Sequence, residues 1–243
     1  MWNSAVFVAE LLGTLFLVLG ALSVVITSKS SAIKDLKGKS IFVAAGIGIA
    51  LMLAIYVTLG YEANAHVAAT GWVNPAATLA VCLATNSWDL ALSGLVGQLT
   101  GALIGGFVFV IIAFMVKDLK TVITETLAFP EGENDILSMA TMEFVGSSLF
   151  VGGIATVASF GVAANLTPAI VGLFITLVLL TIGSKYALVL NPAAFLMPMI
   201  AGLVLSRPSN GKAVAINVTV GIASCLAAAA MVGGIAYTSK LFQ

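Results

Sequence analysis

Long apolar stretches, separated by short polar ones, form the most regular pattern along this chain. A helix that crosses the hydrocarbon core of a bilayer needs about 20 predominantly apolar residues. Because six stretches approach or exceed this length, the pattern predicts an all-α membrane protein with six transmembrane helices. The six predicted spans are residues 5–27, 40–60, 89–116, 138–160, 167–186 and 213–237.

Two further apolar runs, residues 75–84 and 192–201, are too short to cross a bilayer. Each begins at a proline, which is favoured at the first helical position, and follows an asparagine, one of the best N-cap residues. About ten residues of helix cover roughly 15 Å, half the thickness of the hydrocarbon core. The pattern predicts two half-helices that open on the same motif, Asn74-Pro75-Ala76 in the first and Asn191-Pro192-Ala193 in the second.

The two halves of the chain repeat the same elements in the same order. A Glu-x-x-Gly element opens the first span of each half, at Glu10 and at Glu143, and Asn-Pro-Ala-Ala follows later in each. Because each half has an odd number of spans, the second half enters the membrane from the opposite side, as in an inverted repeat. We therefore expect a single membrane channel domain over residues 1–243. Its two halves are residues 1–120 and 138–243, and residues 125–137 form the polar connector between them.

Two half-helices that enter from opposite sides place their N-termini together near the middle of the membrane. Their helix dipoles give this point a positive potential. Non-helical backbone must precede each half-helix, and at this depth it is tolerated only where it is buried in protein or lines a wet cavity. The pattern therefore indicates a pore.

Composition supports lipid as the solvent and excludes several functions. The chain is 60% hydrophobic and 8% charged, whereas soluble domains carry about 25% charged residues. Because the net charge is zero and the basic residues are scattered along the sequence over several loops, no nucleic acid partner is expected. Cys82 and Cys225 lie in apolar segments, where buried thiols pack rather than react. With one histidine and no cysteine–histidine cluster, we expect no metal and no cofactor.

The paired Asn-Pro-Ala motifs, the paired Glu-x-x-Gly elements and the six spans together resemble the major intrinsic protein family of aquaporins and glycerol facilitators. The resemblance extends over nearly the whole chain and includes Gln98, Gly101 and Gly183. It implies an aquaporin-like fold, a multi-pass protein of the plasma membrane, and a homotetramer with one pore in each subunit. It also implies passive conduction of small neutral solutes and no enzymatic activity.

The resemblance assigns roles to residues of both motifs. In this family, the side-chain amides of the two asparagines, here Asn74 and Asn191, donate hydrogen bonds to the permeating molecule. The carbonyl groups just before each motif form a line of acceptors. Carried over by position, this carbonyl ladder is Thr70, Gly71, Trp72 and Val73 in the first half and Ala187, Leu188, Val189 and Leu190 in the second.

The selectivity filter departs from the family pattern. The family has arginine directly after the second Asn-Pro-Ala, where this chain has Ala194. The filter positions of the fifth and second spans correspond to Leu179 and Ile47, so the predicted constriction is apolar and lacks a fixed charge. Lys185, in the loop before the second motif, is interpreted as a surface lysine in preference to a substitute for that charge.

Three glutamate side chains and one histidine side chain allow two interpretations each. We interpret Glu10 and Glu143 as structural carboxylates that accept hydrogen bonds from the backbone before each half-helix, in preference to a proton relay. Segment 61–73 is longer than the family pattern and contains Glu62 and His66. We interpret these two as solvated loop residues, in preference to a pH-sensitive plug at the pore mouth.

At this point, alternatives remain open for the function and for the orientation of the protein in the membrane. The leading hypothesis is a passive channel for small neutral solutes, with glycerol-like polyols or small acids ahead of water. The alternatives are an atypical water channel and a non-conducting membrane scaffold subunit with an occluded pore.

The basic residues gather in the loops after the first, third and fifth spans, which the positive-inside rule places in the cytoplasm. The family resemblance places these loops outside, and we expect the orientation of the family.

Overall fold

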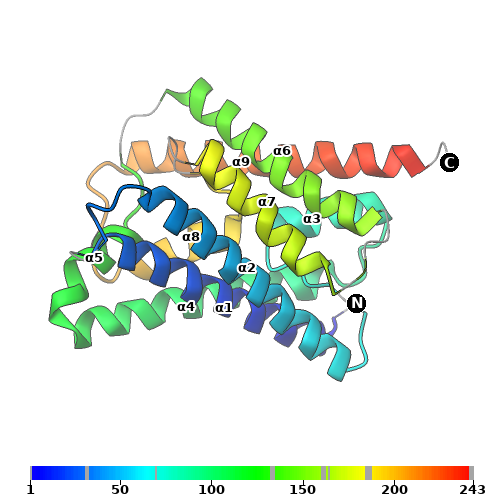
Figure 1. The fold of residues 1–243 in the computed structure, drawn as a ribbon, viewed down its shortest axis with the longest axis horizontal. Coiled ribbons are helices and arrows are strands. Elements are labelled where there is room, and N and C mark those ends of the chain that lie inside the picture. Colours follow the sequence, from blue (N-terminus) through cyan, green and yellow to red (C-terminus); the bar gives the residue numbers. More distant parts are fainter. Residues whose placement is uncertain are drawn as a thin grey trace.

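The computed structural model describes residues 2–30, 33–68, 70–131, 135–159, 163, 165–183 and 188–240. This part of the chain is helical, with no strand (Figure 1). Its helices are α1 (Ser4–Ser28), α2 (Lys39–Asn64), α3 (Pro75–Thr85), α4 (Ala91–Met115), α5 (Lys117–Leu127), α6 (Ile136–Ser159), α7 (Thr167–Thr181), α8 (Pro192–Gly202) and α9 (Gly211–Lys240).

The long helices agree with the predicted spans, with one exception. Among the described residues, five helices are long and apolar enough to cross a membrane, namely α1, α2, α4, α6 and α9. The predicted span 167–186 is wrong at its C-terminal end, because α7 has 15 residues and stops at Thr181. The N–H group of Gly183 then donates to the carbonyl of Val178 at 3.1 Å, five residues back, so the regular helical spacing of hydrogen bonds ends here. The span of α7 is therefore only about 22 Å.

The half-helices α3 and α8 begin at the predicted prolines and have 11 residues each. They lie toward opposite ends of the long axis of the molecule (Figure 1). α3 packs against α9 and α8 packs against α4, so each half-helix contacts the last long helix of the other half. In the same way, α1 contacts α2 and α4, while α6 contacts α7 and α9. Helix contacts in the two halves therefore follow one scheme.

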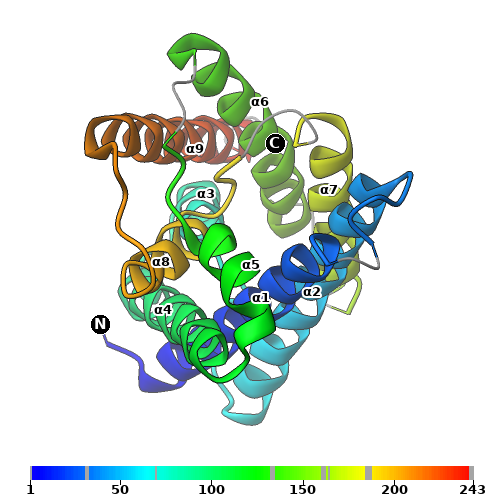
Figure 2. The same ribbon diagram turned by 90° about the vertical axis from the view of Figure 1, so that its left-hand side faces the viewer.

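Helix α5 was not predicted, and the predicted connector 125–137 begins inside it. The sequence of α5 is polar on most of its surface, which made it resemble a loop. Its apolar residues Ile123 and Leu127 are four positions apart, share one face of the helix and are buried. Figure 2 views the molecule from the end that α5 covers. The connector between the two halves therefore begins within a helix that packs on the bundle.

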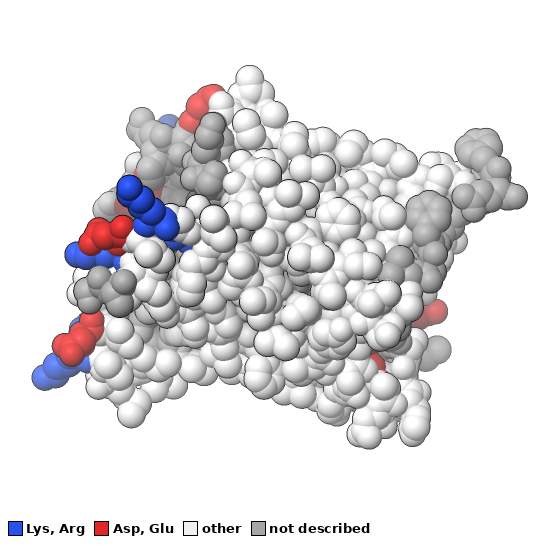
Figure 3. Space-filling model, viewed as in Figure 1, with Lys and Arg blue, Asp and Glu red and all other residues white. Residues whose placement is uncertain are grey.

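The surface of the molecule has the distribution of charge that a bilayer requires. In the view of Figure 3, a broad middle zone shows no charged side chain, and the Lys and Arg residues gather at the end that contains α5. Large hydrophobic side chains are exposed on several helices, among them Phe16, Leu92, Phe114 and Leu173. An apolar surface of this extent is suited to contact with lipid tails.

This gathering of basic residues at one end makes the orientation testable. We expect the family orientation, in which the α5 end faces outward and both termini are cytoplasmic, despite the opposing positive-inside count. An epitope tag at the N-terminus should then be protected from antibody in intact cells and become accessible after permeabilisation. Equal labelling before and after permeabilisation would contradict this orientation.

Candidate pore and selectivity site

Each half-helix is capped by the asparagine of its motif. Oδ1 of Asn74 accepts a hydrogen bond from the N–H group of Ala76 at 2.9 Å. Oδ1 of Asn191 accepts from the N–H groups of Ala193 and Ala194, both at 3.1 Å. These caps satisfy N–H groups that the first helical turn leaves without a partner. They also fix the side chains, so that each amide nitrogen is free to reach away from its own helix.

The same two asparagines join the halves of the molecule. Nδ2 of Asn74 donates to the carbonyl of Leu190 at 2.9 Å, and Nδ2 of Asn191 donates to the carbonyl of Val73 at 2.8 Å. Val73 and Leu190 have φ angles of 45° and 49°, a left-handed conformation that costs on the order of 1–3 kcal/mol per residue. Because an amide nitrogen carries two hydrogens, each asparagine retains one N–H for a further acceptor.

Glu10 braces the backbone in front of α3. This fully buried carboxylate accepts from the N–H groups of Trp72 and Val73 at 2.7 Å each. It also accepts from the hydroxyl of Thr70 at 2.7 Å and from Nε2 of Gln98 at 2.9 Å. Its oxygens therefore receive four hydrogen bonds, about as many as a carboxylate can accept. Such contacts are what the structural interpretation of Glu10 requires.

Glu143 occupies the equivalent place in front of α8. It accepts from the N–H groups of Val189 and Leu190 at 2.5 and 2.9 Å, and from the hydroxyl of Ser147 at 2.7 Å. Its side chain is 1% exposed. The two glutamates therefore hold the two non-helical segments by the same kind of contact, on the two residues that precede each motif asparagine.

Glu62 is not a solvated loop residue, and that interpretation is wrong. Helix α2 continues to Asn64, so Glu62 lies in its last turns, where it is fully buried. Its carboxyl group accepts from the N–H group of Thr70 at 2.8 Å and also contacts the hydroxyl of Thr70. His66, by contrast, is exposed just after α2, in agreement with the solvated interpretation. The first part of segment 61–73 thus completes a helix.

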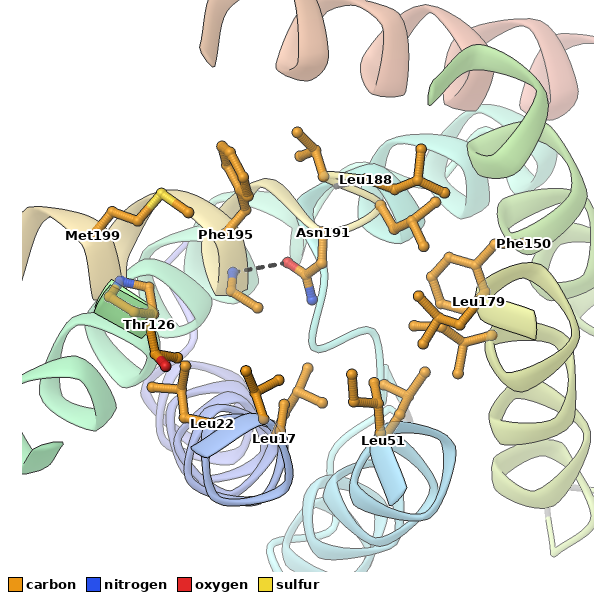
Figure 4. Close-up of a pocket in the computed structure, with 18 residues that line it drawn as sticks. Leu17, Leu22, Leu51, Thr126, Phe150, Leu179, Leu188, Asn191, Phe195 and Met199 are labelled. Carbon is orange, nitrogen blue, oxygen red and sulfur yellow. Dashed lines mark hydrogen bonds between the residues drawn. The ribbon is translucent and has the colours of Figure 1, made fainter. Parts of the chain in front are cut away.

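A cavity of about 240 Å³ lies beside Asn191 (Figure 4). The three predicted filter positions meet at its wall, with Ile47 contributed by α2, Leu179 by α7 and Ala194 by α8. Asn74 is 1% exposed and does not line this cavity. The structure thus brings the filter positions together with one motif asparagine and leaves the other outside the cavity.

The carbonyl ladder is divided in the same way. In the second half, Leu188, Val189 and Leu190 line the cavity, whereas Ala187 and also Lys185 lie outside the described residues. The four predicted ladder residues of the first half do not line it. Their segment is the one that Glu10 and Glu62 hold.

Sequence reasoning missed most of the remaining wall, which Figure 4 shows around the cavity. The missed lining residues are Leu17, Ala21, Leu22, Val25, Leu51, Thr126, Phe150, Ile175, Phe195, Pro198 and Met199. A spacing of three or four residues connects those on α1, but in a uniformly apolar span this spacing does not distinguish the pore face from the lipid face.

The wall of the cavity is almost wholly apolar. Among the described lining residues no side chain carries a charge, and the polar ones are Asn191 and Thr126. The N-termini of α3 and α8 add positive partial charge near Asn191. A neutral solute can therefore find a donor at the asparagine and an apolar wall elsewhere, while a cation meets no carboxylate among the described lining residues and no favourable potential from the helix N-termini.

Comparisons with known proteins agree with this geometry. Residues 2–206 match the pattern of the family described as major intrinsic protein. A probable glycerol uptake facilitator protein of Thermotoga maritima is 24% identical over 214 residues, which cover 85% of this chain and 87% of that protein. The X-ray structure of the aquaglyceroporin from Plasmodium falciparum has the same fold, with a TM-score of 0.78 at 17% identity, over 94% of this chain and 93% of that one. The chain therefore belongs to the major intrinsic protein family, as a multi-pass membrane channel for small solutes.

Proposed function

We propose that this protein is a passive channel for small neutral solutes of about the size of glycerol, with polyols and small undissociated acids ahead of water. The observation that carries the proposal is the meeting of Ile47, Leu179 and Ala194 at one cavity beside Asn191. At about 240 Å³ the cavity exceeds the space of a single water molecule, which takes about 30 Å³ in the liquid.

The lining favours solutes that have both carbon and hydroxyl groups. Each buried CH₂ contributes about 0.8 kcal/mol against an apolar wall, a gain that water lacks. A hydroxyl left without a partner costs roughly 2–7 kcal/mol, so the polar side of the solute must face Asn191 and the carbonyls of residues 188–190. The names of the two relatives, a glycerol uptake facilitator and an aquaglyceroporin, are in accord with such a solute.

One observation favours the alternative of an occluded pore. Asn74 is 1% exposed, Val73 is fully buried, and the cavity does not extend to the first half of the carbonyl ladder. A scaffold subunit with a closed pore would have this arrangement at all times, whereas a channel would open beyond Asn74 during conduction.

Stopped-flow light scattering on reconstituted vesicles tests the proposal. Protein-containing vesicles should admit glycerol, and then urea and lactic acid, faster than empty vesicles, with a smaller relative gain for water. Water permeability raised alone would support the atypical water channel. No protein-dependent flux of any solute would support the occluded scaffold and refute conduction.

A paired substitution shows whether the solute passes through this cavity. Ala194→Phe should reduce glycerol flux about tenfold or more, because the added ring fills a cavity that has no room to expand without strain. Ala227→Phe adds the same ring at an exposed position of α9 and should leave the flux unchanged. Equal fluxes in the two variants would place the pathway elsewhere.

A further inference from the structure

The face of α1 that lines the cavity leads to a lysine at the C-terminal end of the helix. Leu17, Ala21 and Val25 line the cavity at intervals of four residues, and the next residue in this series is Lys29. Four residues of helix advance about 6 Å along the axis, which places Lys29 one turn beyond Val25, toward the end that α5 covers. Lys29 is half-buried and follows directly after the last residue of α1.

A single hydrogen bond connects the ammonium group of Lys29 to the cavity wall. Its Nζ donates to Oγ1 of Thr126 at 3.0 Å, and Thr126 lines the cavity. Oγ1 of Thr126 donates its only hydrogen to the carbonyl of Val122 at 2.7 Å. The hydroxyl is therefore oriented, with its lone pairs available to the ammonium. In Figure 4, Thr126 lies on the same side of the cavity as Leu22 and Met199.

Helix α5 is held firmly enough to keep this contact in place. Ile123 and Leu127 are buried at 0% and 1% exposure. Leu127 packs so closely on Gly202 of α8 that a Cβ atom on this glycine would lie 2.6 Å from the carbonyl oxygen of Leu127. Since Thr126 is next to Leu127, the same packing fixes Thr126 in the wall of the cavity.

In the described part of the chain, the charged groups near Lys29 do not neutralise it by direct contact. Among the described residues its hydrogen-bond partner is Thr126, while the carboxylate of Glu125 on α5 and the ammonium of Lys39 on α2 act on it through space. Burial lowers the pKa of Lys29 from its ordinary value, Glu125 opposes this change and Lys39 adds to it. Lys29 is therefore a half-buried positive charge whose hydrogen-bond partner Thr126 lines a largely apolar cavity.

We propose that Lys29 is a specificity-determining residue of the channel, whose ammonium group excludes cations at the α5-side mouth of the cavity. The inference rests on the proposed function, because a charge can exclude cations only from a pathway that solutes use. The neck formed by Ile47, Leu179 and Ala194 has no charge of its own. Charge of one sign beside a cleft with low-dielectric walls changes the local concentration of ions by a factor of about 10 to 10³.

The test compares Lys29→Gln with Lys29→Arg and with a matched control. The control is Lys120→Gln, which removes an exposed lysine of α5 that lies over the ring of Phe114 and does not line the cavity. Potassium efflux and glycerol uptake are measured on the same reconstituted vesicles. Lys29→Gln should raise potassium efflux about tenfold, with glycerol uptake within about twofold of the unsubstituted protein, because the neck itself is unchanged. Lys29→Arg and Lys120→Gln should leave both rates unchanged.

The pH dependence provides a second readout that loss of packing would not reproduce. Because burial lowers the pKa of Lys29, its charge disappears at a lower pH than that of an ordinary lysine. Potassium efflux through the unsubstituted channel should therefore begin to rise at a lower alkaline pH than the deprotonation of an ordinary lysine would give, whereas efflux through Lys29→Arg should stay low, since arginine does not deprotonate.

The outcomes separate this inference from the function on which it rests. If glycerol uptake persists while Lys29→Gln leaves potassium efflux unchanged at all pH values, the role of Lys29 is refuted and the channel function stands. If no variant and not even the unsubstituted protein transports glycerol or another neutral solute, the proposed function fails and the inference fails with it.

Discussion

Replacing Gly101 by alanine should prevent stable assembly of the bundle, whereas the same change at Gly234 should be tolerated. A Cβ atom at Gly101 would lie 2.2 Å from the carbonyl oxygen of Leu11 and 3.0 Å from the backbone nitrogen of Leu15. These are backbone atoms of α1, which cannot rotate away as a side chain can. Alanine therefore forces α1 and α4 apart, and overpacking of this kind costs about 1–3 kcal/mol or more.

The separation of α1 and α4 has consequences beyond the contact itself. Glu10 on α1 and Gln98 on α4 are joined by a 2.9 Å hydrogen bond, and Glu10 in turn holds the backbone before α3. Moving the two helices apart breaks this connection, so the first half-helix loses its support. We expect little monodisperse Gly101→Ala protein in detergent and none of the solute flux.

Gly234 provides a strict control for the same chemical change. It lies in helix α9, and a Cβ atom there would meet nothing within 4 Å. Alanine is favoured over glycine in a helix by about 1 kcal/mol, so Gly234→Ala should be as stable as the unsubstituted protein or slightly more so. Size-exclusion profiles and thermal unfolding measured side by side decide the matter. Normal yield and stability of Gly101→Ala would show that α1 and α4 pack less closely at Gly101 than the structure indicates.

Replacing Glu10 by glutamine should destabilise the protein more strongly than any change of one exposed charge. Each oxygen of Glu10 accepts one backbone N–H group, that of Trp72 or that of Val73. A glutamine amide nitrogen at either position places its N–H groups against the backbone N–H group of Trp72 or Val73, so that two hydrogen-bond donors face each other. One buried N–H group and one side-chain donor are then left without an acceptor, at a cost of about 1–3 kcal/mol each.

The expected result is a fall in the thermal unfolding midpoint by roughly 10 °C, with loss of flux that follows the loss of folded protein. Glu125→Gln, the same change on the exposed face of α5, is the control and should leave the midpoint unchanged. A Glu10→Gln protein that unfolds normally yet loses proton-coupled flux would overturn the structural role and make Glu10 part of a proton pathway.

The two halves of the pore differ in a way that the inverted repeat does not require. On the α8 side, an open apolar cavity reaches Asn191. On the α3 side, Glu62 adds a second buried carboxyl group to the segment that Glu10 already holds. Among the described hydrogen-bond partners of residues 188–190, Glu143 has no such neighbour. We infer that the α3 side is the more tightly held, so the α8 side is the better place to alter selectivity.

Much of the architecture could be predicted from the sequence because its signals are local. The length of an apolar stretch indicates a span, an asparagine before a proline indicates a capped half-helix, and the odd number of spans per half indicates inversion. The family resemblance, and not a local signal, assigned Ile47, Leu179 and Ala194 to one constriction, and the structure brings these three residues to one cavity. The local signals failed at α5 and at Glu62, where a polar residue pattern suggested a loop.

What only the tertiary structure decided is which face of each helix meets the pore and which polar groups meet across the chain. In an apolar span, the lipid face and the pore face have the same composition, so periodicity does not separate them. The bond from Asn74 to Leu190 joins residues 116 positions apart, and that from Lys29 to Thr126 joins residues 97 apart. Such contacts depend on how the helices pack, and no local pattern along the sequence contains that information.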